Sequence, residues 1–191
     1  MTISDQMSDL TGKLLIAMPD MPDPRFQSSV IFLCAQSGEG AMGLIVNKRV
    51  HDVQLGDLME QLSIPKGDAG GAHPVYFGGP VESSRGFVLH TPDYRSDLST
   101  LDAGAAFSMT ATIDILEDIG AGKGPERSLV ALGYAGWGPA QLEAEIAANG
   151  WLIADADPDI VFGEEDGQKW TMALRSMGIN PAILSSSGGN A

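Results

Sequence analysis

One group of glycines has the spacing of a nucleotide-binding loop. Gly38, Gly40 and Gly43 form the pattern G-x-G-x-x-G, whose backbone holds the pyrophosphate of a dinucleotide in many enzymes. This chemistry requires a helix directly after the glycines, because the pyrophosphate lies on the helix N-terminus. Residues 44–47 (LIVN) follow instead, and they are typical of a strand. We therefore interpret the glycines as a turn between two strands.

A second segment, residues 120–125 (GAGKGP), is similar to a phosphate-binding P-loop. Its Lys123 precedes a glycine, so the hydroxyl that holds Mg²⁺ in such loops is missing. A helical pattern also comes before the segment, whereas a P-loop opens a helix. We predict that these residues end a helix and bind no phosphate.

Three aspartates begin like the calcium loop of an EF-hand. They are Asp155, Asp157 and Asp159. The sharp turn of that loop needs glycine at its sixth position, where Ile160 stands, and a bidentate glutamate at its twelfth, where Asp166 stands. We predict a connection between a strand and a helix here, and no calcium site.

Nucleophilic and zinc chemistry find little support in the sequence. The single cysteine, Cys34, stands in the apolar run 30–35, where a thiol is expected to be buried and inert. The three histidines, His51, His73 and His90, have neither helical nor zinc-finger spacing, and no second cysteine completes a zinc site. We expect each histidine at the surface or in a loop. We predict no catalytic residue set, no metal site and no cofactor.

Two further glycine-rich segments are candidates for ligand binding. Residues 77–85 combine a tight turn with hydroxyls and a cation, and Trp137 offers a ring on which a planar ligand could stack. Residues 134–139 run into a predicted helix, whose free N–H groups and dipole favour an anion. Both segments also suit ordinary tight connections. If they border one cleft, the candidate binding residues are Gly78, Gly79, Ser83, Ser84, Arg85, Gly136, Trp137 and Gly138.

Composition restricts the partners of the protein. The chain has 191 residues, of which 43% are hydrophobic and 19% charged, as is typical of one globular domain. Its formal net charge is −14, and Lys48 and Arg49 form the only adjacent basic pair. Because nucleic-acid affinity depends on cations at phosphates, we expect no nucleic-acid partner. No signal peptide or membrane-length apolar run is evident, and a lone cysteine suits a reducing compartment, so we predict a cytoplasmic protein without a membrane partner.

The apolar periodicity predicts an α+β fold. Strands are expected at residues 13–17, 30–35, 44–47, 75–78, 86–90, 107–111, 129–134 and 151–154, and helices at 55–62, 113–119, 139–149 and 170–177. Strand pairs with tight turns come first and helices mostly later, which favours a mixed sheet flanked by about four helices. Such a large twisted sheet tends to curl into a partial barrel. We predict one domain over residues 12–184, with a flexible lead at 1–11 and a flexible tail at 185–191.

Several segments, taken in order, resemble one bacterial family. They are residues 14–19 (LLIAMP), 40–47 (GAMGLIVN), 77–81 (FGGPV), 85–92 (RGFVLHTP), 129–137 (LVALGYAGW) and 149–152 (NGWL). Together they resemble the YqgE/AlgH family over roughly residues 12–183, nearly the whole chain. The resemblance implies an α+β fold with a bifurcated, barrel-like sheet.

The resemblance implies little about activity. The family name reflects a proposed role in regulating alginate synthesis, its members are often labelled transcriptional regulators, and it offers no established catalytic residues. The chain departs from the family pattern at two places. A histidine often stands two places after the cysteine, where this chain has Gln36, and a glycine usually precedes Gln141, where it has Ala140. The first departure argues against Cys–His chemistry, and the second makes the helix start less open to a ligand.

Three functions remain at this point. The absence of a catalytic set and the acidic surface favour a non-enzymatic regulatory or adaptor protein that acts through an unknown protein partner. The alternative is a small-molecule binding protein or enzyme that takes an anionic ligand between residues 77–85 and 134–139. A DNA-binding regulator is suggested only by the family label, and the net charge and the lack of a basic helix argue against it.

Overall fold

A computed structural model describes residues 9–67 and 73–187. Ten strands form one sheet among these residues: β1 (Lys13–Ala17), β2 (Val30–Ser37), β3 (Gly40–Ile45), β4 (Arg49–Gln54), β5 (Pro74–Phe77), β6 (Val81–His90), β7 (Leu101–Asp102), β8 (Ser108–Thr110), β9 (Ser128–Trp137) and β10 (Trp151–Asp155). The main path through the sheet runs β10-β1-β2-β3-β9-β6-β8-β7, and β4 and β5 lie off this path. The sheet is mixed because β5 and β9 pair in parallel.

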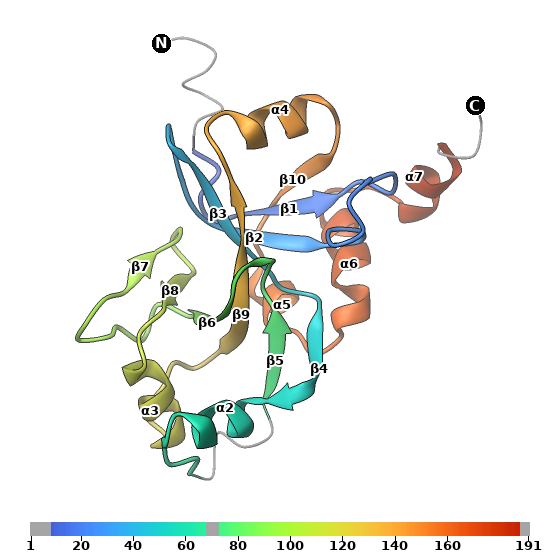
Figure 1. Cartoon of the computed structure of the whole chain (residues 1–191). Coiled ribbons are helices and arrows are strands. Elements are labelled where there is room, and N and C mark those ends of the chain that lie inside the picture. The colour runs from blue at the N-terminus through green and yellow to red at the C-terminus, as the bar shows by residue number, and fades with distance from the viewer. Residues whose placement is uncertain (1–8, 68–72, 188–191) are drawn as a thin grey trace.

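The sheet branches at β9, which runs through the middle of the molecule (Figure 1). The first part of β9 pairs with β5 on one side and with β6 on the other. Its last three residues, 135–137, pair with residues 41–43 of β3. One branch therefore holds β3, β2, β1 and β10, and the other holds the remaining strands. The predicted α+β fold with a mixed, bifurcated and curled sheet is confirmed.

Helices cover the sheet at several places (Figure 1). The described residues contain α2 (Leu55–Gln61), α3 (Asp114–Gly120), α4 (Gln141–Ala147), α5 (Pro158–Val161), α6 (Lys169–Ser176), α7 (Pro181–Ser187) and the 3₁₀ helix η1 (Asp166–Gln168). Four of them, α2, α3, α4 and α6, match the helices expected from periodicity. The short α5 and α7 are additional. The predicted tail starts inside α7, and its residues 188–191, like residues 1–8 of the predicted lead, lie outside the described residues.

Two segments that we expected to be loops are largely strand. β6 already begins at Val81, and β9 continues to Trp137. The signals that suggested loops have another cause: the pairing of β6 with β9 shifts register between Val81 and Gly86. Glu82 adopts a left-handed backbone there, with φ of 46°. The polar residues 82–85 thus belong to an irregular stretch of strand, because pairing between distant strands overrides local turn preference.

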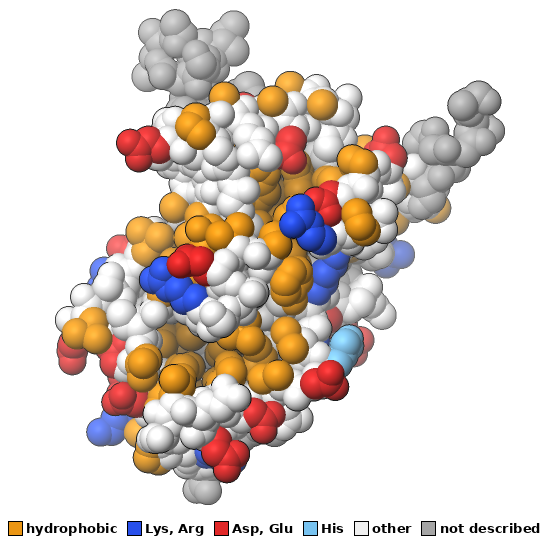
Figure 2. Space-filling model, in the orientation of Figure 1, with side chains coloured by type: hydrophobic (Ala, Val, Ile, Leu, Met, Phe, Trp, Pro, Cys, Tyr) orange, Lys and Arg blue, Asp and Glu red, His pale blue; other side chains and the backbone are white. Residues whose placement is uncertain are grey.

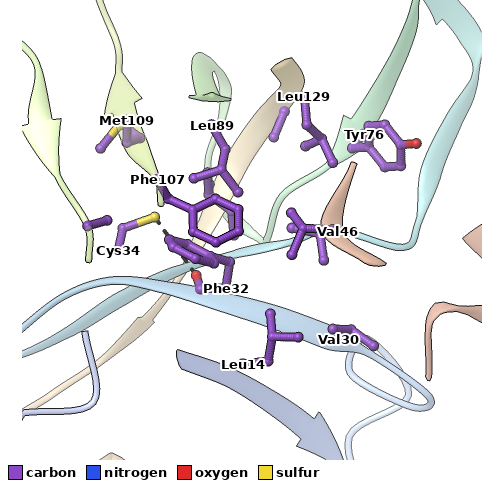
Figure 3. Packing of buried hydrophobic residues seen from close by; sticks show 14 of the residues in the cluster. Leu14, Val30, Phe32, Cys34, Val46, Tyr76, Leu89, Phe107, Met109 and Leu129 are labelled. Carbon is purple, nitrogen blue, oxygen red and sulfur yellow. Dashed lines mark hydrogen bonds between the residues drawn. The ribbon is translucent and has the colours of Figure 1, made fainter. Parts of the chain in front are cut away.

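The main core lies between the two branches of the sheet. Figure 3 shows Leu14, Phe32, Leu89 and Met109 converging there from β1, β2, β6 and β8. The rings of Phe32 and Phe107 pack with centroids 4.6 Å apart. Two smaller clusters lie elsewhere in the fold, one involving α4 and the other α2 and α3. Residues of the curled sheet therefore belong to three apolar clusters. The largest of them packs between the two branches.

Cys34 belongs to this inner core (Figure 3). Its side chain is fully buried, as predicted, and burial raises the pKa of the thiol to about 12. The thiolate is the reactive form of cysteine. The position is therefore that of an inert core residue.

A close crossing of backbones holds the branch point together. The connection from β5 to β6 passes over β9, and glycines occupy both sides of the contact. A Cβ atom on Gly79 would lie 2.0 Å from the carbonyl carbon of Tyr134, and one on Gly133 would lie 2.2 Å from the carbonyl oxygen of Gly79. Gly133 also has a left-handed φ of 75°. Gly78 and Gly79 therefore have a packing role, because a residue with a side chain would not fit at either position.

We predict that Gly133→Ala destabilises the protein by about 3 kcal/mol, because the new methyl group clashes with backbone and the residue keeps an unfavourable φ. Urea unfolding measures the change. Gly86→Ala is the matched control, since a Cβ there meets no atom within 4 Å. Equal stabilities of the two variants would contradict the packing role of Gly133.

We also predict that a thiol reagent labels native Cys34 very slowly. Relative to the ordinary thiol value of 9.0, a pKa of about 12 lowers the thiolate fraction at pH 8 about a thousandfold. Labelling rates measured in buffer and in denaturing urea provide the comparison. A native rate within about tenfold of the unfolded rate would show that the thiol is accessible.

Candidate functional site

The two candidate segments border one hollow. It lies between the β2–β3 hairpin and the strands β6 to β9, with a volume of about 760 Å³. The first segment contributes Val81, Glu82 and Arg85, and the second contributes Tyr134, Gly136 and Trp137. We call this hollow the apolar groove. Of the eight candidate residues, it is lined by Arg85, Gly136 and Trp137.

The other candidate residues lie away from the groove lining. Gly78 and Gly79 belong to the backbone crossing, and Ser83 and Ser84 are exposed on β6. The N–H of Gly138 donates to Oε1 of Gln141 at 3.0 Å, so it is already used within the loop. The anion site expected at the start of α4 therefore lacks one of its donors.

Trp137 does not offer the stacking surface that we expected. Its side chain is only 7% exposed and packs in the cluster that involves α4, with its ring centroid 6.1 Å from that of Trp151. Only part of the indole reaches the groove. The core thus covers almost all of the side chain on which a planar ligand was expected to stack.

Apolar side chains dominate the walls of the groove. They are Ala35, Ala41, Met42, Val81, Phe87, Leu101, Met109, Ala111, Tyr134 and Trp137. Flexible methionines adapt to differently shaped partners. Val81 and Leu101 are unusually exposed for apolar side chains, at 37% and 41%. The groove therefore presents apolar surface that the fold itself does not cover.

Few charged groups stand at the groove, and they are at its rim. Arg85 lies over the ring of Phe87, with its Cζ atom 5.1 Å from the centroid, and pairs with Glu82 at 3.6 Å. Glu39 is the other charged residue of the lining, which includes neither cysteine nor histidine. This arrangement suits the binding of an apolar group.

A charged cluster that sequence reasoning missed surrounds Asp166. Its carboxylate forms a salt bridge with Arg49, accepts a hydrogen bond from the Tyr76 hydroxyl at 2.7 Å, and lies 2.9 Å from Nζ of Lys169. Lys169 is only 1% exposed and also donates to the Val46 carbonyl at 2.8 Å. The partners come from β4, β5, η1 and α6. Only the i, i+3 spacing of Asp166 and Lys169 was visible in the sequence.

Burial and pairing set the charges of this cluster. Burial opposes ionisation of Asp166, but hydrogen bonds from Lys169, Tyr76 and Arg49 hold the pKa of its carboxyl below the usual value. Burial lowers the pKa of Lys169, and Asp166 counteracts it. Burial and the contact with Asp166 raise the pKa of the Tyr76 hydroxyl. A buried charged cluster of this kind is found in structural networks as well as in active sites.

His90 is buried at the end of β6, so the position predicted for it, at the surface or in a loop, was wrong. Its Nδ1 lies 2.8 Å from the Thr91 carbonyl oxygen, and its Nε2 lies 2.8 Å from Oγ1 of Thr110. Since a carbonyl only accepts, Nδ1 carries the proton and Nε2 accepts from Thr110. Burial lowers the pKa of the imidazole. His90 thus serves as a neutral core residue, and both of its ring nitrogens are hydrogen-bonded. A histidine at the end of a strand can take this role.

The motifs rejected on sequence grounds have the expected structures. Gly40 pairs with Ser37 across the turn of the β2–β3 hairpin, and residues 120–125 begin at the last residue of α3 and continue beyond it. The carboxylate of Asp157 caps α5 by accepting from the N–H of Asp159 at 2.9 Å. Within the described ranges, no group of three or more His, Cys, Asp or Glu side chains is arranged to hold a metal ion. No helix there has the length and apolar character needed to cross a membrane.

Comparison with protein families gives one match over most of the chain. The family model described as AlgH-like matches residues 14–182. The chain is 60% identical over 184 residues to the UPF0301 protein SPO0296 of Ruegeria pomeroyi, covering 96% of this chain and 100% of that protein. It is 56% identical over 193 residues to a UPF0301 protein of Jannaschia sp. (strain CCS1), with full coverage of both.

Two solved structures share the fold. The solution structure of the AlgH protein from Pseudomonas aeruginosa has 40% sequence identity and a TM-score of 0.76, with 100% of each chain covered. The crystal structure of protein DIP2367 from Corynebacterium diphtheriae has 22% identity and a TM-score of 0.68, over 91% of this chain and 88% of that one, and supports the fold alone. The resemblance found in the sequence is thus confirmed, and the chain belongs to the AlgH-like family.

Proposed function

We propose that the protein is a non-enzymatic adaptor that binds a segment of a partner protein in the apolar groove. The observation that carries this proposal is the groove itself. Side chains from the β2–β3 hairpin and from four further strands form its walls, and its lining includes no cysteine or histidine. Burial of Val81 and Leu101 by a partner would remove apolar surface from water, which is the main driving force of most protein association.

The partner segment that fits best has apolar side chains flanked by lysine or arginine. Glu39 and Glu82 stand at the rim of the groove; Glu82 pairs with Arg85, whereas Glu39 forms no salt bridge among the described residues. The chain carries a formal net charge of −14. On the face drawn in Figure 2, acidic side chains are spread around hydrophobic ones. Complementary charge would speed the encounter with such a partner and disfavour acidic competitors.

The cellular setting of this interaction is proposed to be the cytoplasm. The single cysteine is buried in the core and forms no disulfide. Proteins that keep such free thiols are common in reducing compartments.

We predict that a photo-crosslinking residue at position 81 captures one defined protein in cells, whereas the same residue at position 172 does not. Met172 on α6 is the matched control, because it is 37% exposed, as Val81 is. Mass spectrometry of the adduct identifies the segment that was bound. A synthetic peptide of that segment should bind the purified protein more weakly as salt increases.

Substitution then tests whether the groove holds the peptide. Val81→Asp should weaken peptide binding at least about tenfold, because it places a charge against an apolar surface, and Met172→Asp should not. Thermal melting of both variants checks that they remain folded. Equal affinity of the peptide for the two variants, or the absence of an adduct specific to position 81, would contradict the proposal.

A further inference from the structure

A second hollow differs from the groove in place and chemistry. It has a volume of about 830 Å³ and lies between the start of β9, β5, the segment after α3 and the connection from α5 to η1. It shares no lining residue with the apolar groove. This volume is within the usual range for small-molecule sites. We call it the polar hollow.

Charges of both signs line the polar hollow. Arg49 and Arg127 bring guanidinium groups, and Glu126, Glu164 and Glu165 bring carboxylates. In the part of the chain that the structure describes, none of these three glutamates forms a salt bridge. The hollow therefore offers free acceptors for a cationic group beside donors for an anionic one.

Neighbouring carboxylates hold both guanidinium groups in position. Arg49 forms its salt bridge with Asp166, and its Cζ atom lies 5.9 Å from the centre of the Tyr76 ring. Nη1 of Arg127 lies 2.8 Å from Asp159. A guanidinium has five N–H donors, so each arginine keeps donors beyond these contacts. Such a group loses little freedom when it binds a carboxylate.

The positive charge of Arg49 is not cancelled by its partner. Asp166 is shared with Lys169, whose ammonium is 1% exposed and 2.9 Å away. Arg49, Asp166 and Lys169 together carry a net charge of +1. This wall of the polar hollow thus favours an anion, whereas the exposed glutamates favour a cation. Arg127 pairs with Asp159, whose side chain is 81% exposed. Solvent therefore strongly screens the attraction between these two charges.

We propose that the polar hollow binds a small zwitterion, whose carboxylate contacts Arg49 and Arg127 and whose ammonium group contacts the free glutamates. Free amino acids are the simplest ligands of this class. The buried Asp166 cluster supports the site by fixing Arg49 before the ligand arrives. This activity is independent of partner binding in the apolar groove, and the two sites are open to separate tests.

The experiment is a thermal-shift screen of the full-length protein against the free amino acids, followed by calorimetry on any hit. A ligand that binds only the folded state raises the melting temperature. Each hit is compared with its analogue without the amine and its analogue without the carboxylate. We expect both analogues to bind at least about tenfold more weakly than the amino acid. A screen without a hit, or an amine-free analogue of equal affinity, would overturn the zwitterion site.

Substitutions test whether the amino acid binds in the polar hollow. Arg127→Gln should weaken the amino acid at least about tenfold, and Arg95→Gln should leave its affinity unchanged. Arg95 is a matched control, because it also pairs with an exposed aspartate, at 2.8 Å, and does not line the polar hollow. Val81→Asp in the apolar groove should leave the affinity for the amino acid unchanged. A failure of amino-acid binding can therefore be distinguished from a failure of partner binding. Full affinity in Arg127→Gln would refute the assignment.

Discussion

The close passage of the β5–β6 connection over β9 is the constraint on which the rest of the structure depends. Gly79 and Gly133 lie with backbone against backbone, at a distance that no side chain permits. Because of this contact, β5 can leave the edge of β9 and β3 can pair with the residues that follow. The two branches then curl around one core in which Phe32 and Phe107 meet. The apolar groove opens beside the same crossing, at the irregular stretch of β6.

The buried charges near α6 add a second connection between distant parts of the chain. Lys169 reaches the carbonyl of Val46, 123 positions earlier, and Asp166 reaches Tyr76 and Arg49. Burying charges has a desolvation cost that pairing only partly offsets. The cluster instead fixes the positions of these elements, because it holds η1 and α6 against β4 and β5. The same cluster sets the positive side of the polar hollow.

The sequence was informative where the signal is local. Periodicity predicted β1, β2, α2 and α6, because their apolar residues repeat at strand or helix spacing over a whole element. It was misleading at residues 77–85, where Gly78 and Gly79, which serve a backbone crossing, look like turn residues, and at residues 134–139, where β9 continues to Trp137. The candidate site was accordingly only partly located: Arg85 and Gly136 line the groove, but Gly78 and Gly79 do not. The Asp166 cluster was out of reach, since its partners are up to 123 residues apart, and the burial of His90 depends on strands that pair only in the folded chain.

The central place of β9 also has a consequence for biosynthesis. Its partners β3, β5 and β6 all precede it in the chain, so each is synthesised with an open edge that only β9 can close. Ribosomes add about 5–20 residues per second, and the roughly 90 residues from the end of β3 to the end of β9 therefore take on the order of 5–20 s. During that time the emerging chain exposes unpaired apolar strands, which are prone to aggregate. Protection of the nascent chain should thus matter most before the ribosome has passed β9.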